Sequence, residues 1–224
     1  MYFTLLFSNI MNLRLTSEKL NRTFYEREEV LTIARELLGK LIVTSFNGEE
    51  TIGRIIETEA YQGITDRASH AYNGRRTPRT ETMYRSGGVA YVYLCYGIHH
   101  LFNVVTNREN IPHAVLVRAI EPVHGKEVML KRSGHSHWDK TIGSGPGNVS
   151  RAMGIVTSHS GMSLQDEKLY LAQDEFLLPD NKIIATPRIG VDYAGEDALL
   201  PYRFVIADHP LLSAKSFTSK FIQP

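Results

Sequence analysis

Two glutamates, Glu57 and Glu59, stand two residues apart in the stretch 54–61, which otherwise has the composition of a buried strand. Alternate residues of a strand share a face, so both carboxylates are expected to point the same way. A strand glutamate usually faces solvent, which would give both residues a structural role. The alternative is that one of them lies at a cleft and acts as a general base that takes a proton from water. Glu59 is the better candidate, because an aromatic residue, Tyr61, follows it by two positions.

Four further residues could form a binding pocket beside such a base. Tyr61 and Tyr93 offer ring faces, and His70 and Asn103 offer hydrogen-bonding groups. Together with an acid, this set suits a pocket for a planar heterocycle. Taken alone, His70 would be an ordinary structural histidine, so its role depends on the other three residues.

The stretch 89–107 has two β-rich halves that meet at Gly97, which predicts a β-hairpin. Alternation places Tyr91, Tyr93 and Cys95 on one face, while Tyr96 falls on the other face beside the turn. Aromatic residues in strands are most often core residues or cross-strand partners. Tyr96 has little core within reach, however, and an exposed apolar tip near arginines is what a wedge into the DNA minor groove requires.

Elsewhere, apolar periodicity and turn residues predict helices and strands without regular βαβ alternation, which indicates an α+β fold. At 224 residues the chain is long enough for one large domain, and no linker divides it. The predicted elements are helices over 26–40, 121–132 and up to residue 153, a loop with one short helix over 63–88, and strands over 40–46, 51–61, 114–119, 169–171, 182–186 and 202–206.

The net charge of +1 conceals two oppositely charged regions. Residues 67–108 carry six arginines against one acid, whereas residues 159–200 carry eight acids against three basic residues. A net charge this small argues against an extended nucleic-acid surface, but the first region could bind DNA locally.

The single cysteine, Cys95, excludes an internal disulfide and a thiolate zinc site, which fits a reducing, cytoplasmic compartment. His135 and His137 lack a third ligand nearby, so we expect no metal. Residues 1–10 are apolar, but they lack the features of a signal peptide and are too short to span a membrane. We expect them to be a dispensable extension of a domain over residues 11–224.

These residues also resemble a known family. The motifs that carry the resemblance, in order and at near-family spacing, are Glu57-Thr-Glu-Ala-Tyr61, His70, Thr77-Pro-Arg79, Tyr91-Val-Tyr93, Tyr96-Gly97, Asn103, Leu116-Val-Arg-Ala-Ile-Glu-Pro122, Gly145-Pro-Gly147 and Pro187-Arg-Ile-Gly190. Over residues 24–206 the chain is similar to the alkyladenine (3-methyladenine) DNA glycosylases. The resemblance implies a compact domain with a mixed, largely antiparallel, curved sheet, flanking helices and a protruding hairpin that inserts into DNA. It also implies no metal and no organic cofactor.

The resemblance further implies a role for each matched position. Glu59 would be the general base, and Arg118 and the backbone carbonyl of Ile189 would hold the attacking water with it. The residues that would contact the flipped base are Tyr61, His70, Tyr93 and Asn103, and those at the intercalating tip are Tyr96 and Ile98. Our own hypothesis adds phosphate contacts by Arg75, Arg76 and Arg79.

The expected reaction is the release of alkylated purines from double-stranded DNA, 3-methyladenine first and hypoxanthine or other damaged purines as an extension, which initiates base excision repair. No lysine stands at the matched positions, which favours a monofunctional enzyme without strand cleavage. We expect a monomer with no obligatory protein partner and no membrane association. The competing interpretation is a non-enzymatic minor-groove protein in which Glu59 is structural; an acyl- or formyl-transfer enzyme is disfavoured.

Overall fold

The computed structural model describes residues 17–214 and Thr218, so the predicted extension over residues 1–10 lies outside it. Within the described residues, nine strands form one sheet in the order β1-β7-β2-β3-β6-β5-β4, with β9 beside β3 and β8 beside β9. Every paired neighbour runs antiparallel. The strands are β1 (Glu18–Lys19), β2 (Leu41–Phe46), β3 (Glu49–Tyr61), β4 (Ala90–Cys95), β5 (His99–Thr106), β6 (His113–His124), β7 (Leu169–Gln173), β8 (Ile183–Thr186) and β9 (Arg203–Ile206).

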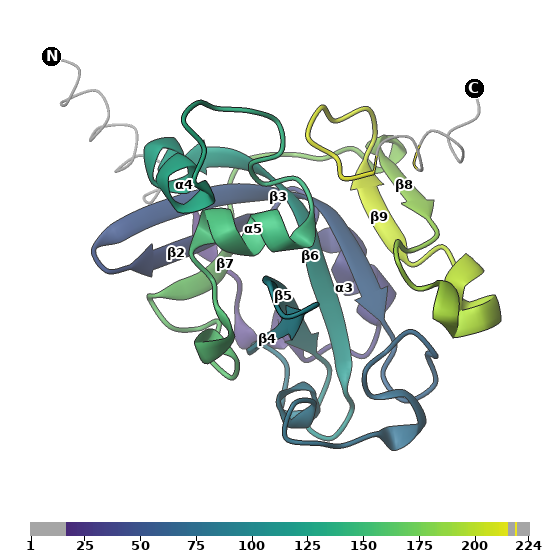
Figure 1. Cartoon of the computed structure of the whole chain (residues 1–224). Coiled ribbons are helices and arrows are strands. Elements are labelled where there is room, and N and C mark those ends of the chain that lie inside the picture. The colour runs from purple at the N-terminus through teal and green to yellow at the C-terminus, as the bar shows by residue number, and fades with distance from the viewer. Residues whose placement is uncertain (1–16, 215–217, 219–224) are drawn as a thin grey trace, which may run out of the picture.

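The long central strand β3 organises the sheet (Figure 1). On one side it pairs with β6 along most of its length. On the other side its first half pairs with β2 and its second half, at Glu57–Glu59, pairs with β9. The β3–β6 register shifts on both sides of Glu57, where an irregular pairing bends the strand locally. The two glutamates therefore lie where β3 is covered by a strand on each edge.

Two tight turns define the hairpins that the sequence predicts. Asn47 and Gly48 join β2 to β3 with φ values of 54° and 76°, and Tyr96 and Gly97 join β4 to β5 with φ values of 50° and 72°. Two successive residues with positive φ match the twist of antiparallel strands. Glycine adopts this conformation freely, whereas Tyr96 does so at a conformational cost.

Helices pack on both faces of the sheet: α5 crosses in front of β3 and β6 in Figure 1, and α3 lies behind them. Helix α3 (Val30–Glu36) buries Ile33 and Ala34 in the main core. It is shorter than the helix predicted over 26–40. The glutamates expected in the first turn of that helix lie before the point where α3 begins. Over residues 17–214 the other helices are α2 (Arg22–Tyr25), α4 (Lys126–Ser133) and α5 (Pro146–Met153), with five 3₁₀ helices: η1 (Tyr72–Gly74), η2 (Glu81–Tyr84), η3 (Thr157–His159), η4 (Asp180–Lys182) and η5 (Asp192–Leu199).

The prediction of a helix over 121–132 is wrong in its first part. Strand β6 continues through Pro122 to His124, and α4 begins only after Gly125, whose φ is 74°. Pro122 pairs with Gly53 beside a register shift, and β5 pairs with β6 only at residues 113–116. A proline, which lacks an N–H group, is tolerated where the strand has one regular neighbour.

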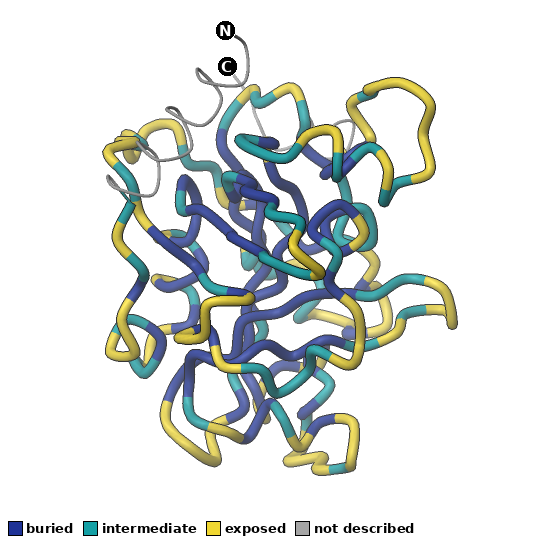
Figure 2. The backbone as a smooth tube through the Cα atoms, turned by 90° about the vertical axis from the view of Figure 1, so that its left-hand side faces the viewer, coloured by how far each residue is buried: buried dark blue, intermediate teal, exposed yellow. Residues whose placement is uncertain are grey.

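The buried residues run through the middle strands, and exposed segments surround them (Figure 2). The remaining predicted strands and the helix ending at Met153 are present, so the described chain is one α+β domain, as expected. The region 63–88 holds two short 3₁₀ helices rather than one. Across residues 17–214, no helix has the length and apolar character needed to cross a membrane.

Candidate active site

A row of paired residues crosses the sheet and brings the predicted site residues together. Tyr91 pairs with Asn103, Asn103 with Leu116, Leu116 with Glu59, and Glu59 with Arg203. Directly paired residues of antiparallel strands lie on the same face. The row therefore crosses five strands, and the site is built on the face of the sheet that its residues share.

A cavity of about 390 Å³ opens on this face. Eight predicted residues line it, namely Tyr61, His70, Arg79, Tyr93, Tyr96, Asn103, Arg118 and Ile189. The loop residues Gly190, Val191 and Tyr193 close the side opposite the hairpin strands. The volume and the aromatic lining fit a small planar ligand.

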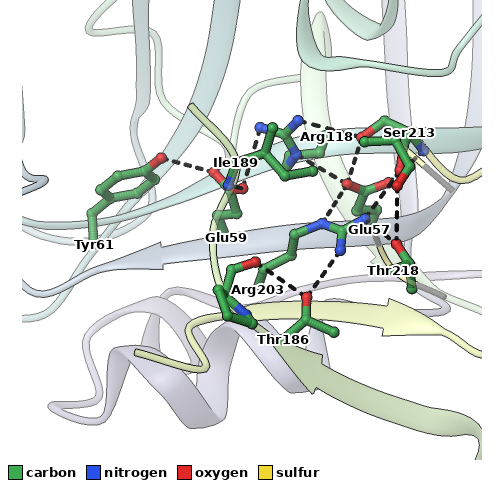
Figure 3. A network of polar contacts seen from close by, with 11 residues as sticks. Glu57, Glu59, Tyr61, Arg118, Thr186, Ile189, Arg203, Ser213 and Thr218 are labelled. Carbon is green, nitrogen blue, oxygen red and sulfur yellow. Dashed lines mark hydrogen bonds and ion pairs between the residues drawn. The ribbon is translucent and has the colours of Figure 1, made fainter. Parts of the chain in front are cut away.

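Glu59 is fully buried directly behind the cavity wall, in contact with three residues that line it (Figure 3). Its Oε1 accepts a hydrogen bond from the backbone N–H of Ile189 at 2.8 Å and lies 3.3 Å from Nη1 of Arg118. Its Oε2 accepts a hydrogen bond from the Tyr61 hydroxyl at 2.8 Å. Burial and the charge of Glu59 together raise the pKa of Tyr61 well above its ordinary value, so Tyr61 remains a donor. Ile189 contacts Glu59 through its N–H group. The role of its carbonyl in holding the attacking water stays a prediction.

Arg118 bridges the two glutamates. Its Nε donates to Oε1 of Glu57 at 3.0 Å, on the side away from Glu59. Burial alone would lower the pKa of the Arg118 guanidinium, but the carboxylates of Glu59 and Glu57 raise it above its usual value. Arg118 therefore stays charged, and both glutamates lie on one face as the alternation predicts.

Ile189 is positioned by its neighbour Arg188. The Arg188 guanidinium donates to Oδ1 of Asp66 at 2.8 Å and to the backbone carbonyl of Ala60 at 2.9 Å. It also lies 4.8 Å from the ring centroid of Tyr61. These contacts fix the loop after β8 against the end of β3, which directs the Ile189 N–H toward Glu59.

The opposite wall contains His70, whose ring meets Tyr93 edge-on at a centroid distance of 4.6 Å. Its Nδ1 is 2.9 Å from the Tyr91 hydroxyl, and its Nε2 is 3.4 Å from Nη2 of Arg79. An arginine donates and cannot accept, so Nε2 is the acceptor and Nδ1 carries the proton. Burial and then the charges of Arg79 and Arg75 lower the pKa of His70 to about 4. His70 is therefore neutral near pH 7.

Asn103 forms part of the cavity floor. Its side-chain amide donates to the backbone carbonyls of Tyr91 at 3.1 Å and Leu101 at 3.2 Å. These bonds fix the orientation of the amide in a buried position. The side chain is thus a rigid part of the floor.

The hairpin tip presents apolar side chains to solvent next to the cavity. Tyr96 is 90% exposed and Ile98 is 67% exposed. Large apolar side chains this exposed often mark a contact surface. Insertion of the tip into DNA remains a prediction.

The three arginines expected at phosphates have different surroundings. Arg76 is paired with Glu81 at 2.6 Å and lies over the ring of Tyr84. Arg79 lies over the Tyr93 ring at 4.8 Å, in the cavity wall. Arg75 is exposed and close enough to His70 to lower its pKa. Arg75 is therefore the arginine whose surroundings best suit a phosphate contact.

The structure adds residues that the sequence did not single out. Tyr91 is the partner of His70, and Asp66 anchors Arg188. Tyr193 lines the cavity with a ring that is 72% exposed, yet its hydroxyl is anchored to the carbonyl of Ala68 at 3.1 Å. Tyr193 lies in an acidic segment, and the charge of that segment is its most evident feature in the sequence. Over the described ranges no three metal-ligating side chains converge, and His135 pairs with Asp139.

Comparison with known proteins agrees with this geometry. A family model described as Methylpurine-DNA glycosylase (MPG) matches residues 23–210. A protein of Chlamydia felis (strain Fe/C-56) is 45% identical over 188 residues, covering 84% of this chain and 95% of its own. Proteins of Desulfitobacterium hafniense (strain Y51) and Bacillus cereus (strain G9842) are each 43% identical, covering 88% and 86% of this chain and 100% and 98% of their own. All three relatives are named "Putative 3-methyladenine DNA glycosylase".

The match spans most of the chain and includes every strand and loop that contributes to the cavity. The resemblance in the sequence is thereby confirmed at the level of the family. The chain belongs to the methylpurine-DNA glycosylase family and is a DNA glycosylase.

Proposed function

We propose that this enzyme turns an alkylated purine out of duplex DNA into the cavity and hydrolyses its N-glycosidic bond with a water activated by Glu59. The observation that carries the proposal is the position of Glu59 behind the wall formed by Tyr61, Arg118 and Ile189. Within the described residues, no acid lines the cavity itself, so Glu59 is the carboxylate nearest to a bound ligand.

Base binding would depend on the aromatic walls. Methylation of a ring nitrogen makes the purine cationic, and a desolvated cation over an aromatic face gains on the order of 1–2 kcal/mol. The Tyr93 ring already contacts one planar cation, the guanidinium of Arg79 at 4.8 Å. Turning the base out of the helix costs a few kcal/mol. Tyr96, with Ile98 beside it, would offset this cost by filling the vacated gap.

The bond-breaking step needs little acid catalysis when the purine is cationic. The oxygen of water attacks C1′, the C1′–N bond breaks, and the base leaves with the electron pair of that bond. Glu59 takes a proton from the water, which must enter between Arg118 and Ile189. General-base assistance contributes typically about 10²–10⁴-fold. The ionised carboxylate also stabilises the positive charge that develops on the sugar.

A neutral lesion such as hypoxanthine would need a proton or a strong hydrogen bond on its leaving group. His70 is a poor source, because its one proton lies on Nδ1, directed to Tyr91, and its Nε2 accepts from Arg79. We therefore propose that cationic purines are the preferred substrates and that hypoxanthine is released more slowly. Asn103 on the floor would disfavour a guanine 2-amino group.

Arg75 would hold a phosphate beside the lesion, with Arg79 closing the pocket. A single duplex site fits one copy of the chain, so we propose a monomer that needs no protein partner. As a DNA repair enzyme of a reducing compartment, it would act in the cytoplasm.

The proposal is tested by incubating the enzyme with methylated duplex DNA and, separately, with a duplex that holds one hypoxanthine. Released bases are identified by chromatography and mass, and strand breaks are measured without alkali. We expect release of 3-methyladenine, slower release of hypoxanthine, and intact strands that carry abasic sites. Tight binding to the methylated duplex without release of any base would show a damage-binding module instead.

A further inference from the structure

Glu57 has no part in the proposed chemistry, yet it accepts more hydrogen bonds than Glu59 (Figure 3). Its Oε1 accepts from Nε of Arg118 at 3.0 Å, from Nε of Arg203 at 2.8 Å and from Oγ of Ser213 at 2.6 Å. Its Oε2 accepts from the backbone N–H of Ser213 at 2.7 Å. A buried carboxylate with this many donors is held in one orientation.

Arg203 connects this cluster to the end of the chain. It is fully buried, and besides Glu57 it donates to Oγ1 of Thr186 at 2.9 Å, to the carbonyl of Ser213 at 3.1 Å and to Oγ1 of Thr218 at 2.9 Å. Ser213 and Thr218 lie beyond the last strand of the sheet. The segment after β9 is therefore bound to β3 at Glu57, two positions before Glu59.

The cluster also determines how Arg118 faces Glu59. The guanidinium is a rigid planar fork, so fixing one edge fixes the direction of the other donors. Glu57 binds the Nε edge at 3.0 Å, and Ser213 Oγ accepts from Nη2 at 3.3 Å. The remaining Nη1 is left 3.3 Å from Glu59. Without Glu57, Arg118 would be free to rotate and to donate to Glu59 through two nitrogens instead of one.

We propose that Glu57, held by Ser213 and Arg203, is a positioning residue that fixes Arg118 and thereby leaves Glu59 able to accept a proton from water. This inference rests on the proposed function of Glu59 as the base. It assigns Ser213 to the catalytic apparatus, although this residue does not line the cavity.

The pH dependence of the reaction distinguishes positioning from a purely structural role. The titratable or charged groups around Glu59 are Glu57, Tyr61, Tyr93, Arg118, Arg188 and Tyr193. Glu57 is the one negative charge in this set, and a nearby like charge raises the pKa of a carboxyl group. Its removal makes the negative charge of Glu59 less costly, so the acid limb of the rate profile moves to lower pH.

The test is the single-turnover rate of 3-methyladenine release from methylated duplex DNA, measured from about pH 5 to pH 8. For Glu57→Gln we expect a fall of about tenfold or more in the plateau rate. The acid limb should move by about half a unit or more to lower pH, with the duplex affinity unchanged. Asp174→Asn is the matched control, because it removes the carboxylate partner of Arg54, on the same strand but outside the cavity lining. It should alter stability but neither the plateau nor the limb.

A second pair of variants covers the possibility that Glu57→Gln does not fold. Ser213→Ala keeps every charge and the backbone donor to Glu57, and we expect it to lower the plateau rate by about three- to tenfold. Ser213→Thr restores the hydroxyl and should restore the rate. The positioning role is overturned if the wild type releases base and the folded variants behave like it. That means Ser213→Ala, and Glu57→Gln where it folds, keep the wild-type plateau rate and acid limb. Absence of release by the wild type would instead overturn the proposed function.

Discussion

Glu57 and Glu59 are the same residue type on the same face of the same strand, and both are completely buried. All three partners of Glu59 line the cavity: Tyr61, Arg118 and Ile189. Of the partners of Glu57, Arg118 lines the cavity, whereas Arg203 and Ser213 lie behind it. Glu59 thus lies next to the cavity, whereas Glu57 lies among donors whose positions are fixed.

The difference shows that position relative to the cavity, rather than residue type or burial, decides which carboxylate can do chemistry. Both residues pair with β9, but two positions along β3 change the side-chain partners from Arg203 and Ser213 to the loop after β8. The shared partner, Arg118, couples the two sites. Changes on the Glu57 side should therefore act first on stability, and changes on the Glu59 side first on rate.

The largest effect on stability is expected from Arg203→Met. This change leaves Glu57 with Arg118 as its remaining cation and removes three further hydrogen bonds made by Arg203. Breaking one partner of a buried ion pair typically costs about 3–5 kcal/mol. Urea unfolding, monitored by circular dichroism, should show a loss of this size. An unchanged midpoint would mean that the cluster does not hold the C-terminal segment in place.

The second effect is a loss of stability at acid pH, and it arises from the opposite wall of the cavity. The pKa of His70 is about 4 in the folded protein, below its ordinary value of 6.5. The unfolded chain binds the extra proton first, so the free energy of unfolding falls as the pH drops from about 6.5 to about 4. The loss attributable to His70 is at most about 3 kcal/mol, since one pKa unit corresponds to about 1.4 kcal/mol.

The check is urea unfolding of the wild type and His70→Gln at several pH values. The variant has no titrating group at this position, so its stability should depend less on pH over this window. Equal slopes for the two proteins would show that the fold does not lower the pKa of His70.

The smallest expected effect comes from a change beside Glu59, and it tests directly how the surroundings of Glu59 differ from those of Glu57. Tyr61→Phe keeps the ring but removes the hydroxyl that donates to Glu59 Oε2. The charged form of Glu59 loses a donor, so the acid limb of the rate profile should move to higher pH. The direction is opposite to that expected for Glu57→Gln. A limb that moves down, or does not move, would remove Tyr61 from control of the base.

Much of this arrangement could be predicted from the sequence. Period-two alternation placed Glu57 and Glu59 on one face, and Asn47-Gly48 and Tyr96-Gly97 marked the hairpins. These features depend on neighbouring residues, whose geometry is set locally. The same holds for the face shared by Tyr91 and Tyr93.

The rest depends on contacts between distant segments. No local pattern shows that Arg203 and Ser213 reach Glu57, about 150 residues away in the chain. Pro122 seemed to end a strand because its missing N–H group usually does so, yet β6 continues past it opposite Gly53. Tyr193 could not be assigned to the cavity from the sequence. Nothing in the sequence distinguishes an exposed tyrosine whose hydroxyl is hydrogen-bonded from any other surface tyrosine.

The most direct test of the different roles of the two glutamates measures both variants in one experiment. Single-turnover base release from methylated duplex DNA and the urea midpoint are determined for Glu59→Gln and Glu57→Gln. We predict that Glu59→Gln loses about 10²–10⁴-fold in rate and keeps most of its stability, because the Gln carbonyl oxygen still accepts from Ile189 while its amide NH₂ can donate to the Tyr61 hydroxyl. Glu57→Gln should lose more stability and less rate. If Glu59→Gln releases base at the wild-type rate, Glu59 is not the base and the account is wrong.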